Sequence, residues 1–372
     1  GVRVIRAFNQ QDNEQKRFES TTTKQKEEQI IAGNLSAVLN PATTIIVNFG
    51  IIAILYISGF KINAGSMTQG EVISLINYMN QILLSMYVFA NVIVILNKAS
   101  ASYKRCADVL SQKPDIVQGI NEAPSDYQNL ITYDHVSFSY YSGNALTDVS
   151  FNILPGQTIG IIGGTGSGKT TLINLIPRFY DVTEGEIRIK DLPIKSYKFK
   201  DLRNMIGIVP QQATLFGGTI RENMQWGHPH ATDEEIYEAL ELSQSKEFVD
   251  KMTEGLDTYI EQGGKNVSGG QRQRLTIARA LVKKPEILIL DDSASALDFA
   301  TDAKLRKALS TLNMTVIIVS QRVSALMHAD SIVVLSHGEV VGQGTHDMLM
   351  NTCDVYQEIV MSQMEGGQNN EE

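Results

Sequence analysis

The sequence predicts an α/β domain in the C-terminal part of the chain, preceded by an all-α hairpin of two long apolar helices. Gln157–Ile162 has the pattern of a short buried strand that enters a glycine-rich loop, Gly163–Thr170, and Thr171–Ile176 has the pattern of the helix that leaves it. Glu286–Asp292 is a second apolar run of strand length, and it ends in two carboxylates. Two apolar runs of about one bilayer thickness, nearer the N-terminus, predict the hairpin.

The glycine-rich loop, GGTGSGKT, matches the phosphate-loop pattern G-x-x-x-x-G-K-[ST]. In such a loop backbone N–H groups turn toward phosphate oxygens, and the following helix N-terminus adds partial positive charge. Lys169 is expected to reach the β- and γ-phosphates of ATP, and Thr170 to hold Mg²⁺. Taken alone, the motif could also be a glycine-rich turn of an unrelated fold. The expected nucleotide contacts are Gly163, Gly164, Thr165, Gly166, Ser167, Gly168, Lys169, Thr170 and Thr171.

The apolar run Glu286–Asp292 (EILILDD) supplies acidic groups where a strand is expected to end. A Mg²⁺-binding aspartate is needed beside a phosphate loop, and such a strand end is a suitable place for it. We therefore expect Asp291 to bind Mg²⁺ together with Thr170. The alternative is an ordinary buried strand with a polar exit.

A third motif, VSGGQ at Val267–Gln271, precedes Arg272–Lys284, which is periodic enough for a helix. This order places Ser268, Gly269 and Gly270 at a helix N-terminus, a position that favours anions. Because the chain already has one phosphate loop, a second anion-binding tip suggests a second ATP shared across a dimer. The residues expected to contact it are Ser268, Gly269, Gly270 and Gln271.

Together these motifs resemble the ATPases of ABC transporters, and above all the exporter class, in which a membrane domain and an ATPase domain are fused in that order. The resemblance covers essentially the whole chain. It implies that Tyr140 (in VSFSY) stacks on adenine and that Gln211 (in IVPQQ) touches Mg²⁺ and senses the membrane domain. It also places the D-loop, with Asp298, at Ser295–Asp298 (SALD), and the switch residue within Ser320–Arg322 (SQR).

Two positions depart from the family pattern at the residues responsible for hydrolysis. Members that hydrolyse ATP well carry Glu after the Mg²⁺-binding Asp and a switch His, whereas this chain has Asp292 and Gln321. The Asp side chain is one methylene shorter than Glu, and a misplacement of about 1 Å can cost about 10²-fold in rate. Gln can donate a hydrogen bond but cannot carry a proton charge. Both changes in one site favour slow hydrolysis with binding retained; tolerated drift is the alternative.

The composition excludes some classes of protein. The chain has 372 residues, a net charge of −9 and two widely separated cysteines, Cys106 and Cys353. The acidic balance argues against nucleic-acid binding, which requires basic surfaces. The cysteines give no disulfide framework and suit a reducing compartment. Since the chain begins at Gly1, inside a charged helical pattern, we expect it to be a C-terminal fragment.

The apolar runs Pro41–Phe60 and Val72–Leu96 predict a membrane hairpin, with buried soluble helices as the alternative. The link between them offers only Lys61. Basic residues gather outside the runs, at Arg3, Arg6, Lys16, Arg17, Lys24, Lys26, Lys98, Lys104 and Arg105. The positive-inside rule therefore places both ends in the cytoplasm, as expected for a multi-pass protein of the plasma membrane. Polar residues in the second run fit either a substrate pathway or hydrogen bonds between helices.

These patterns divide the chain into four parts. Residues 1–112 are expected to form the end of an exporter membrane domain, containing the last two of its six membrane helices. Residues 113–128, with two prolines and a glycine, have the composition of a linker. Residues 129–364 are expected to form the ATPase domain, and residues 365–372 a disordered polar tail.

The leading functional hypothesis is one half of a heterodimeric ABC exporter, in which this chain contributes the site that hydrolyses slowly. Its expected partners are a second half-exporter subunit, the lipid bilayer and a hydrophobic or amphipathic substrate, with ATP and Mg²⁺ as cofactors and no nucleic acid. A homodimeric exporter with slow hydrolysis is one alternative. A non-transport ABC protein, including a regulatory ATP sensor, is another.

Overall fold

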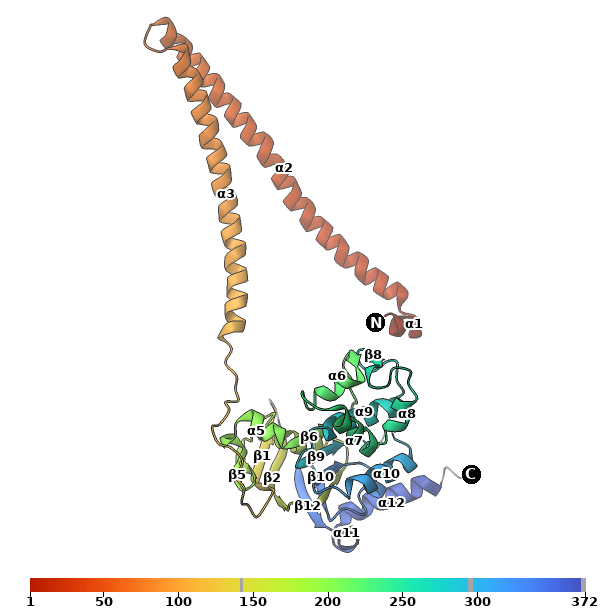
Figure 1. The fold of residues 1–372 in the computed structure, drawn as a ribbon. Helices are drawn as coiled ribbons and strands as arrows, with labels where there is room; N and C mark the ends of the chain where they lie inside the picture. The colour runs from red at the N-terminus through yellow and green to blue at the C-terminus, as the bar shows by residue number, and fades with distance from the viewer. Residues whose placement is uncertain (141–142, 294–296, 369–372) are drawn as a thin grey trace. The chain divides into compact units, whose positions relative to one another are not determined.

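The computed structural model describes residues 1–140, 143–293 and 297–368, and the chain separates into two compact units, Gly1–Lys113 and Pro114–Glu372. Figure 1 shows a long helical hairpin in the first unit and sheets surrounded by helices in the second. The predicted fold class, an all-α hairpin followed by an α/β domain, is confirmed.

The first unit contains helices α1 (Val2–Ala7), α2 (Gln11–Asn63) and α3 (Gln69–Ser111). The turn between the long helices is shorter than the sequence pattern indicates, because α2 continues to Asn63. Gly65 makes the turn with a φ of +71°. Thr68 then begins α3 with a capping box: its side chain accepts a bond from the Glu71 N–H, and its own N–H donates to the Glu71 carboxylate at 2.8 Å.

The hairpin helices present large apolar side chains outward. Among the described residues, Pro41–Asn63 of α2 and Gln69–Ser111 of α3 are long and apolar enough to cross a membrane, and the hairpin itself buries almost none of their surface. Ile46, Phe49 and Phe89 are each about two-thirds exposed or more. Apolar surface of this extent requires lipid or further helices to cover it.

The second unit is built on β-sheets that place several strand ends at one edge. In the described part of this unit, a six-stranded sheet has the order β12-β11-β3-β10-β9-β6 and a four-stranded sheet the order β2-β1-β4-β5. In the larger sheet all neighbours are parallel except β11 and β12. The strands are β1 (Ile131–Ser139), β2 (Asn144–Ile153), β3 (Thr158–Gly163), β4 (Glu184–Ile189), β5 (Leu192–Pro193), β6 (Ile206–Val209), β7 (Gly218–Thr219), β8 (Tyr259–Ile260), β9 (Ile287–Asp291), β10 (Thr315–Val319), β11 (Ser331–Ser336) and β12 (Glu339–Gly344).

Helices cover one face of the larger sheet, and the smaller sheet packs on its other face. The α-helices are α4 (Lys169–Leu175), α5 (Phe199–Asn204), α6 (Ile220–Gln225), α7 (Asp233–Leu242), α8 (Lys246–Asp250), α9 (Gly269–Leu281), α10 (Phe299–Leu309), α11 (His346–Thr352) and α12 (Asp354–Gln368). Short 3₁₀ helices are η1 (Ile194–Ser196), η2 (Gly255–Asp257) and η4 (Val323–Ala325).

Strand β10 shows how the two cores are divided. Val316 and Ile318 join the apolar core shared with α7, α9 and α12, whereas Ile317 and Val319 join the core shared with the four-stranded sheet. Alternate side chains of a strand point to opposite faces, so β10 is buried on both sides, as central strands of parallel sheets are. This burial gives the carboxyl ends of β3, β9 and β10 a rigid position.

Two segments outside the sheets bear on the predicted boundaries. The stretch 113–128 lies along the α/β unit, where the Gly119 N–H donates to the Tyr197 carbonyl at 2.9 Å and the Gln128 N–H to the Asp191 carboxylate at 2.7 Å. At the C-terminus α12 continues to Gln368, so the first half of the predicted disordered tail is helical. Residues 369–372 lie outside the described part.

Candidate nucleotide site

Neighbouring strands bring three segments of the chain together at one sheet edge. In the parallel register Val319 of β10 pairs with Ile161 of β3 and with Asp291 of β9. The ladder continues past the strand ends, because the Asp292 N–H donates to the Val319 carbonyl at 2.9 Å and the Ser320 N–H to the Ile161 carbonyl at 3.1 Å. The phosphate loop, the acidic pair and the SQR segment are therefore adjacent in the fold.

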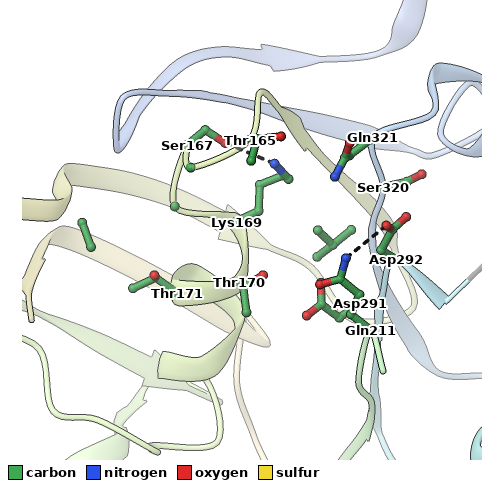
Figure 2. A pocket seen from close by; sticks show the side chains of 14 residues that line it. Thr165, Ser167, Lys169, Thr170, Thr171, Gln211, Asp291, Asp292, Ser320 and Gln321 are labelled. Carbon is green, nitrogen blue, oxygen red and sulfur yellow. Dashed lines mark hydrogen bonds between the residues drawn. The ribbon is translucent and has the colours of Figure 1, made fainter. Parts of the chain in front are cut away.

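The phosphate loop closes around the ammonium group of Lys169. Its Nζ donates to the carbonyls of Gly163 at 2.9 Å and Gly164 at 2.7 Å. It also lies 3.4 Å from Ser167 Oγ (Figure 2). Gly168 has a φ of +99°, and a Cβ there would lie 2.7 Å from the Ala145 carbonyl. Glycine is therefore required at the turn into α4, and the helix begins at Lys169, two residues earlier than the sequence pattern indicates.

A cavity of about 300 Å³ opens beside this loop. It brings together the loop, the acidic pair, Gln211 and Gln321, all of which the sequence singled out. Its lining is Ala145, Thr165, Gly166, Ser167, Gly168, Lys169, Thr170, Thr171, Gln211, Asp291, Asp292, Val319, Ser320 and Gln321. Ala145 and Val319 were not anticipated, because neither carries a polar group that a motif would show.

The charged groups of the cavity are poorly solvated. Burial lowers the pKa of the Lys169 ammonium, although the carboxylates of Asp291 and Asp292 oppose this shift. Burial and the Asp292 carboxylate raise the pKa of Asp291, against the opposing effects of Lys169 and of a hydrogen bond from Thr170. Each charge costs free energy in the ligand-free site. A phosphate group beside Lys169 and a cation beside Asp291 would lower that cost.

The two departures from the family pattern both lie in this cavity. Asp292 follows β9 and has a φ of +44°, a conformation that Asp adopts more readily than longer residues. Its carboxylate is 3.5 Å from Gln211 Nε2, the limit of a hydrogen bond (Figure 2). Gln321 approaches from the segment that follows β10. The cavity thus contains the carboxylate of Asp292 and the amide of Gln321.

Tyr140 lies beside this cavity but is not among its lining residues. Its hydroxyl is 3.4 Å from Thr171 Oγ1, and its ring makes edge contacts with Phe138 and Tyr180. Together these aromatic rings line a separate hollow of about 750 Å³. Tyr140 remains about two-fifths exposed, so one part of the ring is available for stacking. Adenine stacking on Tyr140 stays a prediction.

The signature segment lies at the start of α9 and does not line the cavity. Ser268 is the N-cap: its side chain accepts from the Gln271 N–H at 3.2 Å, and its own N–H donates to the Gln271 side chain at 3.0 Å. This capping box starts the helix at Gly269, earlier than the sequence periodicity indicates. Ser268 and Gly269 are exposed, so they remain accessible to another molecule.

Asp298 caps a different helix. Its carboxylate accepts from the Thr301 N–H at 2.9 Å and from the Thr301 hydroxyl at 2.7 Å at the start of α10. These bonds lower the pKa of Asp298. Like the signature, it does not line the cavity, and Ser295 and Ala296 of the predicted D-loop lie outside the described residues.

The residues present fit Mg²⁺ and a nucleoside triphosphate. The Thr170 hydroxyl, the Asp291 carboxylate and the Gln211 side-chain oxygen are the hard ligands that Mg²⁺ prefers, and all three line one cavity. Gly164 has open space where a Cβ would stand, and Gly166 combines open space with a φ of +78°. The outer side of the loop can therefore be approached closely by phosphate oxygens.

Comparisons with known proteins agree with this architecture. The family described as ABC transporter matches residues 146–295, and the ABC transporter transmembrane region matches residues 1–86. The Bacillus subtilis "Uncharacterized ABC transporter ATP-binding protein YfiB" is 40% identical over 97% of this chain and 63% of its own length. The B. subtilis "Probable multidrug resistance ABC transporter ATP-binding/permease protein YheI" is 35% identical over 96% and 62%.

A solved structure gives the same result for the fold. The structure described as a bacterial Atm1-family ABC exporter with ATP bound superposes with a TM-score of 0.86 at 28% identity, and covers 97% of this chain and 65% of that one. The chain belongs to the ABC transporters and combines the transmembrane region of that family with its ATPase domain. It is therefore a membrane protein. It spans about 63% of the length of the relatives that it matches.

Proposed function

We propose that this chain is an ATP-binding and permease subunit of an ABC exporter, and that its own nucleotide site binds ATP but hydrolyses it slowly. The observation that carries the proposal is the composition of the cavity. Lys169, Thr170 and Asp291 provide what binding of Mg-ATP requires, whereas Asp292 and Gln321 occupy the two positions on which hydrolysis depends. When bound, Mg²⁺ would neutralise phosphate charge.

The short side chain of Asp292 gives the slow hydrolysis its physical reason. The Asp292 N–H donates a hydrogen bond to the Val319 carbonyl of β10. Because this bond fixes the backbone of Asp292, a shift of the backbone does not bring the carboxylate further into the cavity. It instead lies at the limit of hydrogen-bond distance from Gln211. A water held by this carboxylate would be about 1 Å or more from its productive position, a displacement that can cost about 10²-fold.

The signature segment is proposed to serve the ATP of a partner subunit. Ser268 and Gly269 are exposed and do not line the cavity of their own chain. A helix N-terminus with an intact cap favours an anionic group. In the head-to-tail dimer of this family, the signature of one chain faces the phosphate loop of the other, so an intact signature here would complete a catalytic site on a second, different half-exporter.

The membrane part supports export rather than ATP sensing alone. Helix α3 carries Asn77, Asn80, Gln81, Ser85 and Asn91 within its apolar stretch. Polar groups at that depth face other helices or a water-filled pathway. Together with the multidrug resistance description of YheI, this supports a hydrophobic or amphipathic substrate. The excess of basic residues outside the two apolar runs supports a plasma-membrane protein with the ATPase domain in the cytoplasm.

The experiment follows the decay of labelled Mg-ATP trapped in the assembled exporter, purified with its native partner subunit in lipid nanodiscs. Two pools are expected, one that turns over rapidly and one that persists over several turnovers. Lys169→Ala removes the ammonium from this chain's phosphate loop and should abolish only the slow pool. Lys200→Ala, at an exposed lysine of α5, is the matched control and should leave both pools unchanged.

Two results would contradict the proposal. A single rapidly decaying pool in the parent protein would show that Asp292 and Gln321 support ordinary hydrolysis. Loss of the rapid pool in Lys169→Ala would show that this phosphate loop belongs to the catalytic site.

A further inference from the structure

The side chain of Gln363 in helix α12 makes two hydrogen bonds to the segment that carries Gln321. Gln363 Nε2 donates to the Gln321 carbonyl at 2.7 Å, and Gln363 Oε1 accepts from the Val323 N–H at 2.9 Å. Both polar ends of one amide are thus used on one short backbone segment. The contact joins residues 42 and 40 positions apart in the sequence.

The position of Gln363 follows from the packing of α12. Tyr356 and Val360 are buried in the core of the α/β unit. Gln363 lies seven residues after Tyr356 and three after Val360, so it continues the same helix face. Because that face is fixed by the core, the amide at its end is presented to the segment after β10 in one orientation.

The segment needs this support. The Val323 N–H is the first of η4, whose N-cap Arg322 makes no side-chain capping bond, and the first N–H groups of a helix have no partner within it. Ser320 is held by β3 through the Ile161 carbonyl, and its Oγ accepts from the Arg322 N–H at 3.0 Å. Gln363 holds the Gln321 carbonyl, which lies between Ser320 and Arg322, and the Val323 N–H, which follows Arg322.

We propose that Gln363 is a positioning residue for the nucleotide site: its amide fixes the backbone of Gln321 and Val323, and so holds the Gln321 side chain in the cavity. The inference rests on the proposed function, since it concerns the part of the cavity that would meet the γ-phosphate. Figure 2 shows Gln321 beside Ser320, facing the cavity that the phosphate loop lines. The C-terminal helix is thereby coupled to recognition of ATP.

The test is equilibrium binding of labelled Mg-ATP and Mg-ADP to the full chain in nanodiscs, with the residual binding of Lys169→Ala subtracted. Gln363→Met keeps the length and apolar stem of the side chain but removes both hydrogen bonds. It should weaken Mg-ATP binding roughly fivefold, the size expected for one or two lost hydrogen bonds, and Mg-ADP binding less than about twofold. ADP lacks the γ-phosphate that Gln321 would contact.

Matched variants separate positioning from general stability. Gln357 is another glutamine of α12, and its side chain donates to the Met350 carbonyl at 2.8 Å, away from the cavity. Gln357→Met should leave the ratio of ATP to ADP affinity unchanged. Gln321→Ala should reproduce the selective loss, and combining it with Gln363→Met should add nothing further. Gln363→Glu keeps the acceptor for Val323 but loses the donor to Gln321, and should show the same selective loss even if the Met variant does not fold.

Equal losses for ATP and ADP, no loss in Gln363→Met and Gln363→Glu, or additive losses in the double variant would each overturn the inference. These results differ from failure of the proposed function. If the parent and Lys169→Ala bind Mg-ATP equally, the proposed site is wrong and the inference is lost with it. If parent binding depends on Lys169 but the Gln363 variants keep the parent's ratio, only the inference fails.

Discussion

Lengthening Asp292 should restore hydrolysis at this site. In Asp292→Glu the backbone stays anchored by the bond from Asp292 N–H to the Val319 carbonyl, and the added methylene carries the carboxylate about 1.5 Å further into the cavity. Gln321→His, made in the same chain, returns a group that can carry a proton charge. Both positions already line the cavity, so no rearrangement of the sheet is required.

We expect two effects of the double variant, one on the rate of hydrolysis and one on the stability of the fold. If a misplacement of about 1 Å costs about 10²-fold, correcting it should raise single-turnover hydrolysis at this site by about 10- to 100-fold in the double variant. Asp292 has a φ of +44°, where Asp is tolerated better than Glu. The same variant should therefore be slightly less stable, by on the order of 1 kcal/mol.

The assay is single-turnover decay of labelled Mg-ATP in the proposed slow pool of the assembled exporter. Asp292→Asn, which has the same length but no charge, is the control and should not accelerate decay. A double variant that retains ATP as long as the parent would refute the argument that carboxylate reach and the switch residue limit hydrolysis. Faster decay in Asp292→Asn would refute it as well.

Two further predictions concern the signature and the acidic pair. Ser268→Arg should reduce steady-state ATPase activity of the assembled exporter by about 10²-fold or more, as loss of aligned donors does, while Asp292→Ala changes it little; equal losses would contradict an asymmetric pair of sites. Burial and Asp292 raise the pKa of Asp291 above its unfolded value. The stability that this shift contributes is fully present below the unfolded pKa and is lost as pH rises through the raised pKa. Asp291→Asn should therefore raise the melting temperature of the ligand-free chain at neutral pH, by about 2–4 °C for each kcal/mol, and flatten its dependence on pH; a lower melting temperature would contradict the argument.

The sequence predicted the parts of the fold that local chemistry dictates. The strand before the phosphate loop, the apolar strand with its acidic end and the hairpin of apolar helices follow from periodicity and loop chemistry, and the fold class they predict is confirmed. Helix starts were less accurate. Periodicity placed the start of α9 at Arg272, but the capping box between Ser268 and Gln271 extends it to Gly269, because a cap adds glycines that apolar periodicity does not register.

The sequence could not show contacts made by residues far apart in the chain. Gln363 lies in a stretch of Gln, Met and Ser without a motif, and its role depends on how α12 packs against the core. The hollow lined by Tyr140 and Tyr180 likewise depends on contact between two rings that lie far apart in the sequence. Such pairings are set by tertiary packing, which a single sequence does not reveal.

The rigid sheet edge separates two properties that evolution can alter independently. The groups that would hold a nucleotide come from the loop after β3 and from the last residue of β9, both fixed by strand pairing. The groups that would set its lifetime, Asp292 and Gln321, lie just beyond the strands and contribute nothing to the apolar core. After duplication of a gene for such a chain, one copy could exchange these two side chains and hold its nucleotide longer, while its fold, its phosphate loop and its signature segment are inherited unchanged.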